Sequence, residues 1–402
     1  MNSSAIATPA TTRLSAVQAG THRVVPPHET WARLEPLLPA AGITRVADVT
    51  QLDDIGVPVW QAIRPNSANL AVSQGKGISH ELARVSAAME SFELFCAESP
   101  QLPVRSARVA ELADGLPYRW SDLVLLDHHV MGPWSHLQWW PAEDLHTGRD
   151  TWVPLDAVSV DLRMRSRWAP PTVHTSSNGL AGGNSMTEAT VHGLLEVMER
   201  HAMARFLVQG RIWDAAVRTV PGAHGAARTV VERCLDAEAV VEVTDVTCEL
   251  GVPSFAARIW SPSVPWWFSG SGAHLDADIA LSRAVTEAVQ SRLTVVTGAR
   301  EDLPDVPYNF SARPPAPPQP RRAAGSDARE GSRVRSTDDL LAPHCAPMAK
   351  SRDLEAELAH LLDVADRHGT AVMRADLTHP SFGVPVVHVL TPGLRFTPKA
   401  WS

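Results

Sequence analysis

Acidic residues recur at helical spacing in two separate parts of the chain. One predicted helix, ending near Phe206, carries Glu188, Glu196 and Glu199, and Arg200 follows directly. At about 100° per residue, Glu188 and Glu199 fall within about 20° of each other and Glu196 about 80° away. Three carboxylates on one side of a half-buried helix repel one another unless a cation lies among them. A solvated acidic face is the alternative, but an upstream copy of the pattern favours the cation site.

That upstream copy lies in a second predicted helix, which runs from about His80 to Glu98. Glu90 and Glu93 are one turn apart on it, and apolar residues occupy the remaining positions. We therefore expect two helices to face each other across a cleft lined by carboxylates. Hard oxygen ligands favour Mg²⁺, which stays partly hydrated and bridges to substrate phosphates. The predicted metal ligands are Glu90, Glu93, Glu196 and Glu199.

A glycine-rich segment precedes each of these helices, at residues 74–77 and 176–184. Glycine-rich loops let backbone N–H groups approach an anion closely. Together with Arg200, the loops and the cleft predict a nucleotide site. The sequence contains no Gly-x-x-x-x-Gly-Lys-Ser/Thr motif, so this site differs from the Walker plan.

Three motifs, in this order along the chain, resemble those of the YcaO family. The similarity covers roughly residues 20–300 and a last strand near 384–394. The first motif joins Gln74-Gly75-Lys76-Gly77 to Ser86, Glu90 and Glu93; the second joins residues 177–184 to Glu188, Glu196, Glu199 and Arg200; the third contains Glu287, Gln290 and Arg292.

The resemblance implies ATP- and Mg²⁺-dependent phosphorylation of a peptide-backbone amide oxygen, which a nucleophile then replaces. The catalytic residues would be Glu90, Glu196, Glu199 and Arg292, with Arg292 on the phosphates. The family also places a basic residue seven positions before a hydroxyl residue near the first helix, and here Arg23 stands where Lys is more familiar. The implied nucleotide contacts are Arg23, Thr30, Lys76, Ser86, Asn184, Glu188, Arg200, Gln290 and Arg292.

The implied product depends on the nucleophile, which gives an azoline, an amidine or a thioamide. Azoline-forming members finish with alternating prolines, whereas this sequence ends in residues 396–402 without Pro-x-Pro-x-Pro and shows no leader-peptide-recognition domain. Both features favour a member that modifies a ribosomally made precursor peptide with a separate partner. Thioamide formation beside a TfuA-like protein is the leading expectation. Azoline or macroamidine formation, a non-catalytic nucleotide-binding scaffold and a metal-dependent hydrolase remain alternatives.

Composition narrows the setting of this chemistry. The 402-residue chain has a net charge of −8 and no run of 18 apolar residues, so neither nucleic acid nor a membrane is an expected partner. Four scattered cysteines without Cys-x-x-Cys argue against zinc and fit a reducing cytoplasm. The seventeen histidines show no metal-binding spacing, and His192, on the carboxylate side of its helix, is expected to lie behind the ligands.

The alternation of helical and strand-like segments predicts an α+β fold, with helices packed on mixed or antiparallel sheets around one nucleotide cleft. A symmetric homodimer is the expected oligomer. Strands are expected at 43–49, 57–63, 123–126, 137–140, 151–154, 158–162, 240–246, 254–259, 371–376 and 384–390, with further helices at 28–38, 276–296 and 354–368. The expected parts are a disordered leader (1–21), the nucleotide-binding portion (22–300), a Pro-rich mobile loop (301–340) and the C-terminal part of the same domain (341–402).

Overall fold

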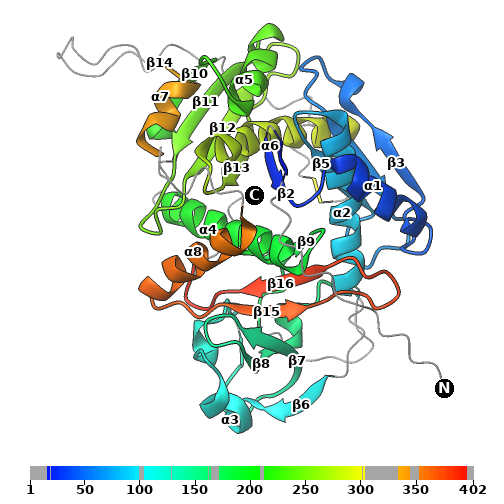
Figure 1. Ribbon diagram of the computed structural model, residues 1–402, viewed down its shortest axis with the longest axis vertical. Coiled ribbons are helices and arrows are strands. Elements are labelled where there is room, and N and C mark those ends of the chain that lie inside the picture. The colour runs from blue at the N-terminus through cyan, green and yellow to red at the C-terminus, as the bar shows by residue number, and fades with distance from the viewer. Residues whose placement is uncertain are drawn as a thin grey trace, which may run out of the picture.

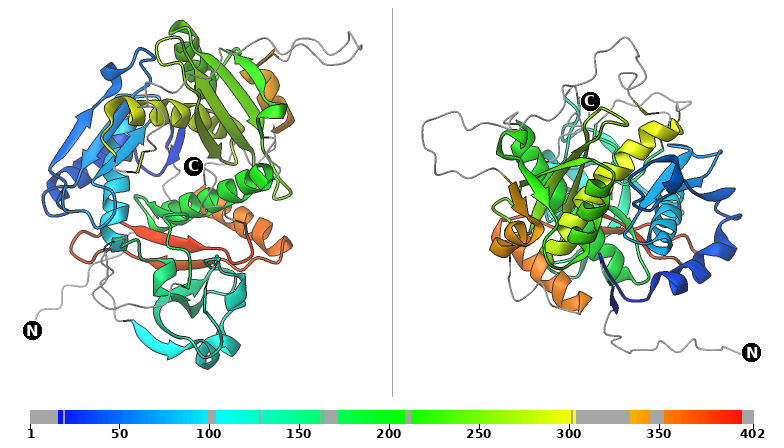
Figure 2. Two further views of the ribbon diagram at one scale, coloured as in Figure 1. Left: turned by 180° about the vertical axis from the view of Figure 1, so that it is seen from behind. Right: turned by 90° about the horizontal axis from the view of Figure 1, so that it is seen from above.

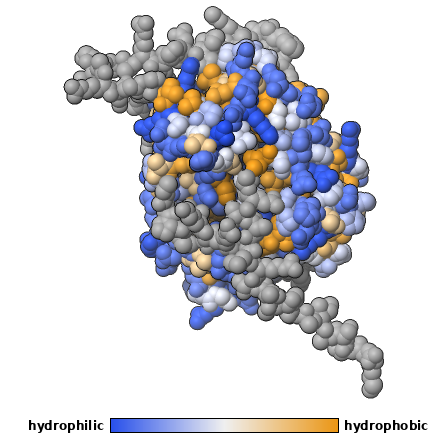
Figure 3. Space-filling view, turned by 45° about the horizontal axis from the view of Figure 1, so that its top comes forward, coloured by the Kyte–Doolittle hydropathy of each residue, from blue (hydrophilic) through white to orange (hydrophobic). Residues whose placement is uncertain are grey.

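The fold consists of helices packed on antiparallel and mixed sheets, as the sequence predicts (Figure 1). The computed structural model describes residues 16–18, 20–98, 104–127, 129–161, 163, 172–208, 212–300, 302–303, 334–344 and 353–395. Hydrophilic and hydrophobic residues are intermixed over the face seen in Figure 3. In the described part of the chain, no helix combines the length and apolarity that crossing a bilayer requires.

The first sheet is three-stranded and antiparallel, and helix α2 (His80–Glu98) packs on it. Its strands are β3 (Arg45–Asp48), β4 (Val59–Ile63) and β5 (Val72–Lys76). The predicted glycine-rich loop at 74–77 is therefore largely strand. A Cβ on Gly75 would lie 2.0 Å from the Ala87 nitrogen of α2, so this glycine permits close packing of strand on helix.

The second sheet repeats this arrangement around helix α6 (Ala277–Thr297). The glycine-rich stretch at 269–274 is mostly edge strand β13. A Cβ on Gly272 would lie 2.3 Å from the Ala280 carbonyl oxygen of α6, so this glycine permits close packing of strand on helix. Helix α6 lies between this sheet and the N-terminal one, and appears yellow between green and blue elements in Figure 2. The strand order is β13 (Phe268–Ala273), β12 (Ser254–Trp260), β11 (Val240–Asp245), β10 (Val217–Val220) and β14 (Val334–Ser336), with α5 (Ala226–Asp236) packed alongside α6 and α7 (Thr337–Leu341) after β14.

The third sheet joins the C-terminal strands to the middle of the chain. Strand β16 (Val386–Leu390) pairs with β9 (Leu180–Gly182), and helix α4 (Met186–Val208) packs on β16 and on α8 (Leu354–Arg367). The sheet order is β6 (Arg105–Arg108), β7 (His136–Asp144), β15 (Met373–Asp376), β16 and β9, with β8 (Arg149–Pro154) also on β7 and α3 (Val109–Leu112) after β6.

The N-terminal segment corrects one prediction. Strand β1 (Ala16–Gln18) pairs with β2 (Thr21–Arg23), so the end of the expected disordered leader forms a ribbon, while 1–15 lie outside the described residues. Helix α1 (Pro27–Leu34) begins after Pro26 without a side-chain cap and ends four residues before the predicted end at 38.

The structure also differs from the predicted strands at two places. Residues 123–126 form no strand and contribute only an isolated bridge from Leu125, and residues 158–160 form none. Most of the Pro-rich segment lies outside the described residues, but its end forms β14 and α7, which shows order there. The C-terminal residues 396–402, whose missing proline pattern guided the expected product, also lie outside the described residues.

Candidate nucleotide and magnesium site

A large cleft runs between the helices that carry the predicted motifs. Its volume is about 560 Å³, which falls within the range of roughly 300–1,000 Å³ of ligand pockets. Helices α2, α4 and α6 and edge strands β5, β9 and β13 supply its walls, together with β2. Strand β5 packs on α2 and β13 packs on α6, so motif residues of the strands and of the helices line the same cleft.

The structure brings together all four predicted metal ligands. Glu90 and Glu93 come from α2, and Glu196 and Glu199 come from α4, and all four line the cleft. Burial raises the pKa of Glu93 to about 8 and that of Glu196 to about 7, with two neighbouring glutamates adding to each shift. Burial also raises the pKa values of Glu90 and Glu199. Carboxylates held together at this cost are the electrostatic setting in which a divalent cation binds.

Hydrogen bonds from the edge strands fix two of these carboxylates in place. The Gly182 N–H of β9 donates to Glu93 Oε1 at 2.6 Å. The Ser271 hydroxyl and the Ala273 N–H of β13 donate to Glu199 at 2.5 and 3.0 Å. Each contact ties a helix to the edge strand opposite it, so the carboxylate geometry is set before a ligand binds.

Glu188 has a different role from the other predicted glutamates. Its carboxylate is 1% exposed and accepts hydrogen bonds from Arg23 Nη1 at 3.0 Å, the Val24 N–H at 2.9 Å, and the Asn184 N–H and Nδ2 at 3.2 and 3.1 Å. Thr30 in turn donates to Asn184 Oδ1 at 2.9 Å. Since four donors already surround Glu188, it positions Arg23 and Asn184 on the cleft wall and is unsuited to metal ligation.

Cationic side chains also line the cleft, and they suit an anionic ligand beside the cation. Lys76 forms a 2.6 Å ion pair with Glu287 of α6, and Arg200 lies 3.6 Å from Glu196. Arg283 makes no hydrogen bond and no ion pair with any residue that the structure describes, and burial lowers its pKa to about 10. The full set is Arg23, Lys76, Arg200, Arg283 and Arg300.

The sequence prediction did not include Arg283 or Arg300 in the site, and it named Glu287 in the third motif without giving it a role there. A signal for Arg283 and Glu287 was present, because Arg283, Glu287 and Gln290 stand at positions i, i+4 and i+7, which share one helix face. All three line the cleft, and Gln290 Nε2 donates to the Gln74 carbonyl oxygen at 3.0 Å. Arg300 follows the end of α6 and carried no periodic signal.

The structure contradicts the predicted role of Arg292 as a phosphate ligand. It lies two residues beyond Gln290, about 200° around the helix, and therefore on the opposite face. Its side chain is 1% exposed, lies outside the cleft lining, and binds Asp53 through Nε at 2.9 Å and Asp54 through Nη2 at 2.9 Å. Ser261 and Ser263 accept its other protons at 2.6 and 2.9 Å. Arg292 is thus committed to a buried ion pair with Asp53 and Asp54, and the predicted phosphate role is wrong.

The remaining predicted residues support a ligand-sized space. Ser86 lines the cleft, as does His192, whose pKa lies well below its usual range because of burial and the nearby Arg23 and Arg283. Among the described residues, three buried nitrogen atoms of the lining lack a hydrogen-bond partner: Gln74 Nε2, His192 Nε2 and Arg200 Nε. Unpaired donors beside clustered carboxylates fit an anion and a divalent cation bound together.

Comparison with known proteins agrees with this geometry. The family model for YcaO cyclodehydratases, described as binding ATP and Mg²⁺, matches residues 74–395. A Mycobacterium tuberculosis protein is 40% identical over 380 residues, which cover 93% of this chain and 83% of the relative. A Rhizobium leguminosarum bv. trifolii protein, named for its position in the tfuA 3' region, is 31% identical over 389 residues, or 93% of this chain and 88% of its own.

A solved structure has a similar fold. YcaO from Methanopyrus kandleri, bound with AMPPCP and Mg²⁺, superposes with a TM-score of 0.64 at 22% identity, over 94% of this chain and 93% of that one. The expected resemblance, fold and cofactors are confirmed by these matches. The chain belongs to the YcaO family, whose domain binds ATP and Mg²⁺.

Proposed function

We propose that this protein uses ATP to phosphorylate a backbone amide oxygen of a ribosomally made precursor peptide, and that a sulfur donor delivered by a TfuA-like partner then yields a thioamide. The γ-phosphoryl group bonds to the amide oxygen as its bond to the β-phosphate oxygen breaks, which releases ADP. A hydrosulfide-level sulfur then adds to the amide carbon, and the carbon–oxygen bond breaks to release phosphate and the proton of the sulfur. One oxygen is thereby exchanged for one sulfur, with no change in oxidation state.

The convergence of Glu90 and Glu93 with Glu196 and Glu199 is the observation that carries this proposal. Two helices place these four carboxylates on one cleft, and their raised pKa values indicate that cation binding would relieve strong electrostatic strain. Mg²⁺, when bound, supplies positive charge that offsets the charge of the transferring phosphoryl group.

The chain's own residues would orient the phosphates. Lys76 and Arg200 lie next to carboxylates at the cleft, so both can exchange these partners for phosphate oxygens. Arg23 is held by Glu188 from behind, which directs its guanidinium along the wall. Arg283 takes the phosphate-binding role that the sequence assigned to Arg292, because it lines the cleft and has no competing hydrogen bond among the described residues.

The choice of sulfur as nucleophile rests on one relative. The Rhizobium protein, 31% identical to this chain, is named for the tfuA region, which favours a TfuA-like partner here. A nucleophile that arrives as an anion needs no general base, and the carboxylates of the cleft are assigned to the metal. Azoline or macroamidine formation is the alternative for the same activated amide.

Calorimetric titration with ATP, with and without Mg²⁺, tests the cofactor step. We expect Mg²⁺-dependent binding that weakens at least tenfold in Glu199→Gln and is unchanged in Glu81→Gln, an exposed residue of α2. Mass spectrometry of a candidate peptide, incubated with the protein, ATP, a sulfur donor and the partner, tests the product. Exchange of oxygen for sulfur supports the proposal, whereas loss of water identifies an azoline. Absence of ATP binding would refute the proposed activation step.

A further inference from the structure

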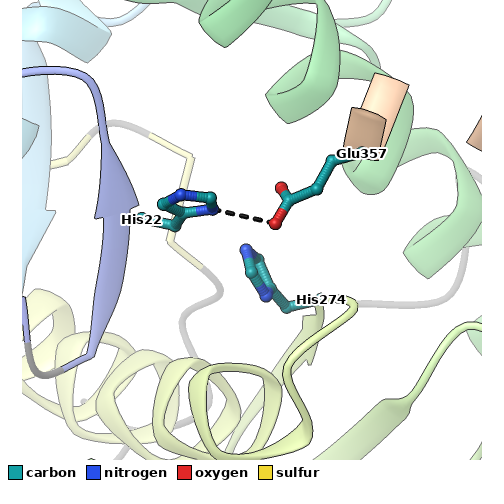
Figure 4. Close-up of side chains that lie close together, drawn as sticks. All are labelled: His22, His274 and Glu357. Atoms are coloured by element: carbon teal, nitrogen blue, oxygen red, sulfur yellow. Dashed lines mark ion pairs between the residues drawn. The ribbon is translucent and has the colours of Figure 1, made fainter. Parts of the chain in front are cut away.

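Three side chains of metal-binding type meet behind the cleft. His22 comes from β2, His274 from the connection between β13 and α6, and Glu357 from α8 (Figure 4). They are 3%, 2% and 2% exposed, and their ligand atoms all lie within 4.8 Å of one another. His22 Nδ1 lies 2.9 Å from Glu357 Oε1. No sequence spacing links positions 22, 274 and 357, so only the fold reveals this cluster.

The cluster is incompletely paired. Glu357 Oε2 is buried and has no hydrogen-bond partner within the described part of the chain. Figure 4 shows a ring nitrogen of His274 pointing toward the His22–Glu357 pair. A buried carboxylate oxygen without a partner is costly, and a simple His22–Glu357 ion pair neither satisfies that oxygen nor uses His274. A cation bound among the three side chains would satisfy all of them.

We propose that His22, His274 and Glu357 bind a divalent transition metal, with Zn²⁺ the best match. Two imidazoles and one carboxylate are ligands that Zn²⁺ prefers, with water completing a tetrahedron. This site is separate from the Mg²⁺ carboxylates, because none of its three residues lines the cleft. Its ligand set also differs, since Mg²⁺ prefers oxygen ligands alone. The lining of the cleft includes Thr21, Arg23 and Ala273, the chain neighbours of His22 and His274, so the cluster lies directly behind the cleft wall.

One local change accompanies ligation. His274 Nδ1 accepts the Asp276 N–H at 2.9 Å, so in the neutral ring the proton is on the nitrogen that faces Glu357. Metal binding at that nitrogen moves its proton to Nδ1. Nδ1 then no longer accepts the hydrogen bond from the Asp276 N–H. The loss is one backbone hydrogen bond, which is small beside three metal–ligand bonds.

The metal would join three segments that are distant in sequence. His22 directly precedes Arg23, whose guanidinium is held on the cleft wall by Glu188. A metal at the cluster therefore anchors β2 to α8 and to the start of α6, and fixes the strand that carries Arg23. The inference is independent of the proposed reaction, because it concerns only metal content and stability.

A second group, His201, Cys248 and Glu249, also has ligand atoms within 4.8 Å of one another. There Glu249 is exposed and already pairs with Arg205 at 2.6 Å, and burial raises the pKa of the Cys248 thiol. Both features disfavour metal binding at this group. Because its ligand atoms are nevertheless close together, the experiment must distinguish it from the His22–His274–Glu357 cluster.

Zn²⁺ binding to the whole chain, measured by elemental analysis and thermal unfolding, tests the proposal. Excess Mg²⁺ is included to occupy the cleft carboxylates. We expect one Zn²⁺ per chain and a rise in unfolding temperature, both lost in Glu357→Gln. Both should be retained in Glu355→Gln, an exposed glutamate of the same helix whose hydrogen bond from Thr187 a glutamine oxygen can still accept. Stoichiometric binding that survives in Glu357→Gln, or no binding to the wild type, would overturn the site.

Co²⁺ absorption provides a measurement that needs no change in the cluster. Wild type and Cys248→Ser should give the same visible bands of a nitrogen- and oxygen-ligated ion, without a thiolate charge-transfer band. A thiolate band that disappears in Cys248→Ser would place the metal at the competing group and refute the assignment, including in the case where Glu357→Gln fails to fold.

Discussion

Replacement of Arg292 by glutamine distinguishes a structural arginine from a phosphate ligand. Its guanidinium is 1% exposed and bonded to Asp53, Asp54 and two serines. Removing one member of a buried ion pair costs about 3–5 kcal/mol, because the other charge is left unpaired. We therefore expect Arg292→Gln to lower the free energy of unfolding by roughly that amount, read from denaturant midpoints at constant m-value. Nucleotide affinity of the remaining folded protein should stay within about twofold of the wild type.

Two further variants sharpen this test. Asp53→Asn combined with Arg292→Gln should lower the free energy of unfolding by less than the sum of the single changes, because the double variant leaves no unpaired buried charge between these two residues. Burial raises the pKa of Asp53 although Arg292 acts to lower it, which shows that the isolated carboxylate would be unfavourable there. Arg283→Gln is the matched control on the cleft side of the same helix and should show the reverse profile, with weaker nucleotide binding and little change in stability. If Arg292→Gln unfolds like the wild type but loses nucleotide binding, the reasoning from its placement is wrong.

The remaining predictions concern proton linkage and packing. The pKa values of Glu93 (about 8) and Glu196 (about 7) exceed the ordinary carboxyl value of 4.5, so the ligand-free folded state holds more protons than the unfolded state. Its stability should therefore fall as pH rises from about 5 to about 8. Binding of Mg²⁺ and nucleotide should release protons and become tighter as pH rises, and calorimetry in buffers of different ionisation enthalpy measures the number released. Flat profiles would contradict the burial of these groups. Gly75→Ala should destabilise by at least about 1–3 kcal/mol, because its Cβ overlaps the Ala87 nitrogen at 2.0 Å. Gly115→Ala, with no atom within 4 Å, should be neutral in the same denaturation assay.

Much of the fold followed from local patterns. The predicted helices at 80–98, 276–296 and 354–368 match α2, α6 and α8 to within a residue at each end, because apolar periodicity is a property of neighbouring residues. The runs at 123–126 and 158–162 misled the prediction. Val158 and Val160 are buried at 0% and 1% without joining a sheet, and a buried irregular segment has the same composition as a short strand.

The glycines show where local patterns stop being informative. The sequence indicated that Gly75 allows a close approach, and an anion was the expected partner; Gly272 of β13 is crowded in the same way. In the fold the approaching group is the backbone of α2 or α6, and the anion-facing atoms belong to side chains around it. A missing Cβ marks a crowded position, but only packing determines what occupies the space.

The sequence by itself determined which carboxylates share a helix face, since the 3.6-residue period places Glu90 with Glu93 and Glu196 with Glu199 before any tertiary contact forms. The tertiary structure alone decided which groups those faces meet. The partner of Arg292 lies 239 residues away at Asp53, and the His22–His274–Glu357 cluster unites three distant elements. Helix period is a short-range property, whereas a charge finds its partner through packing, and packing depends on the whole chain.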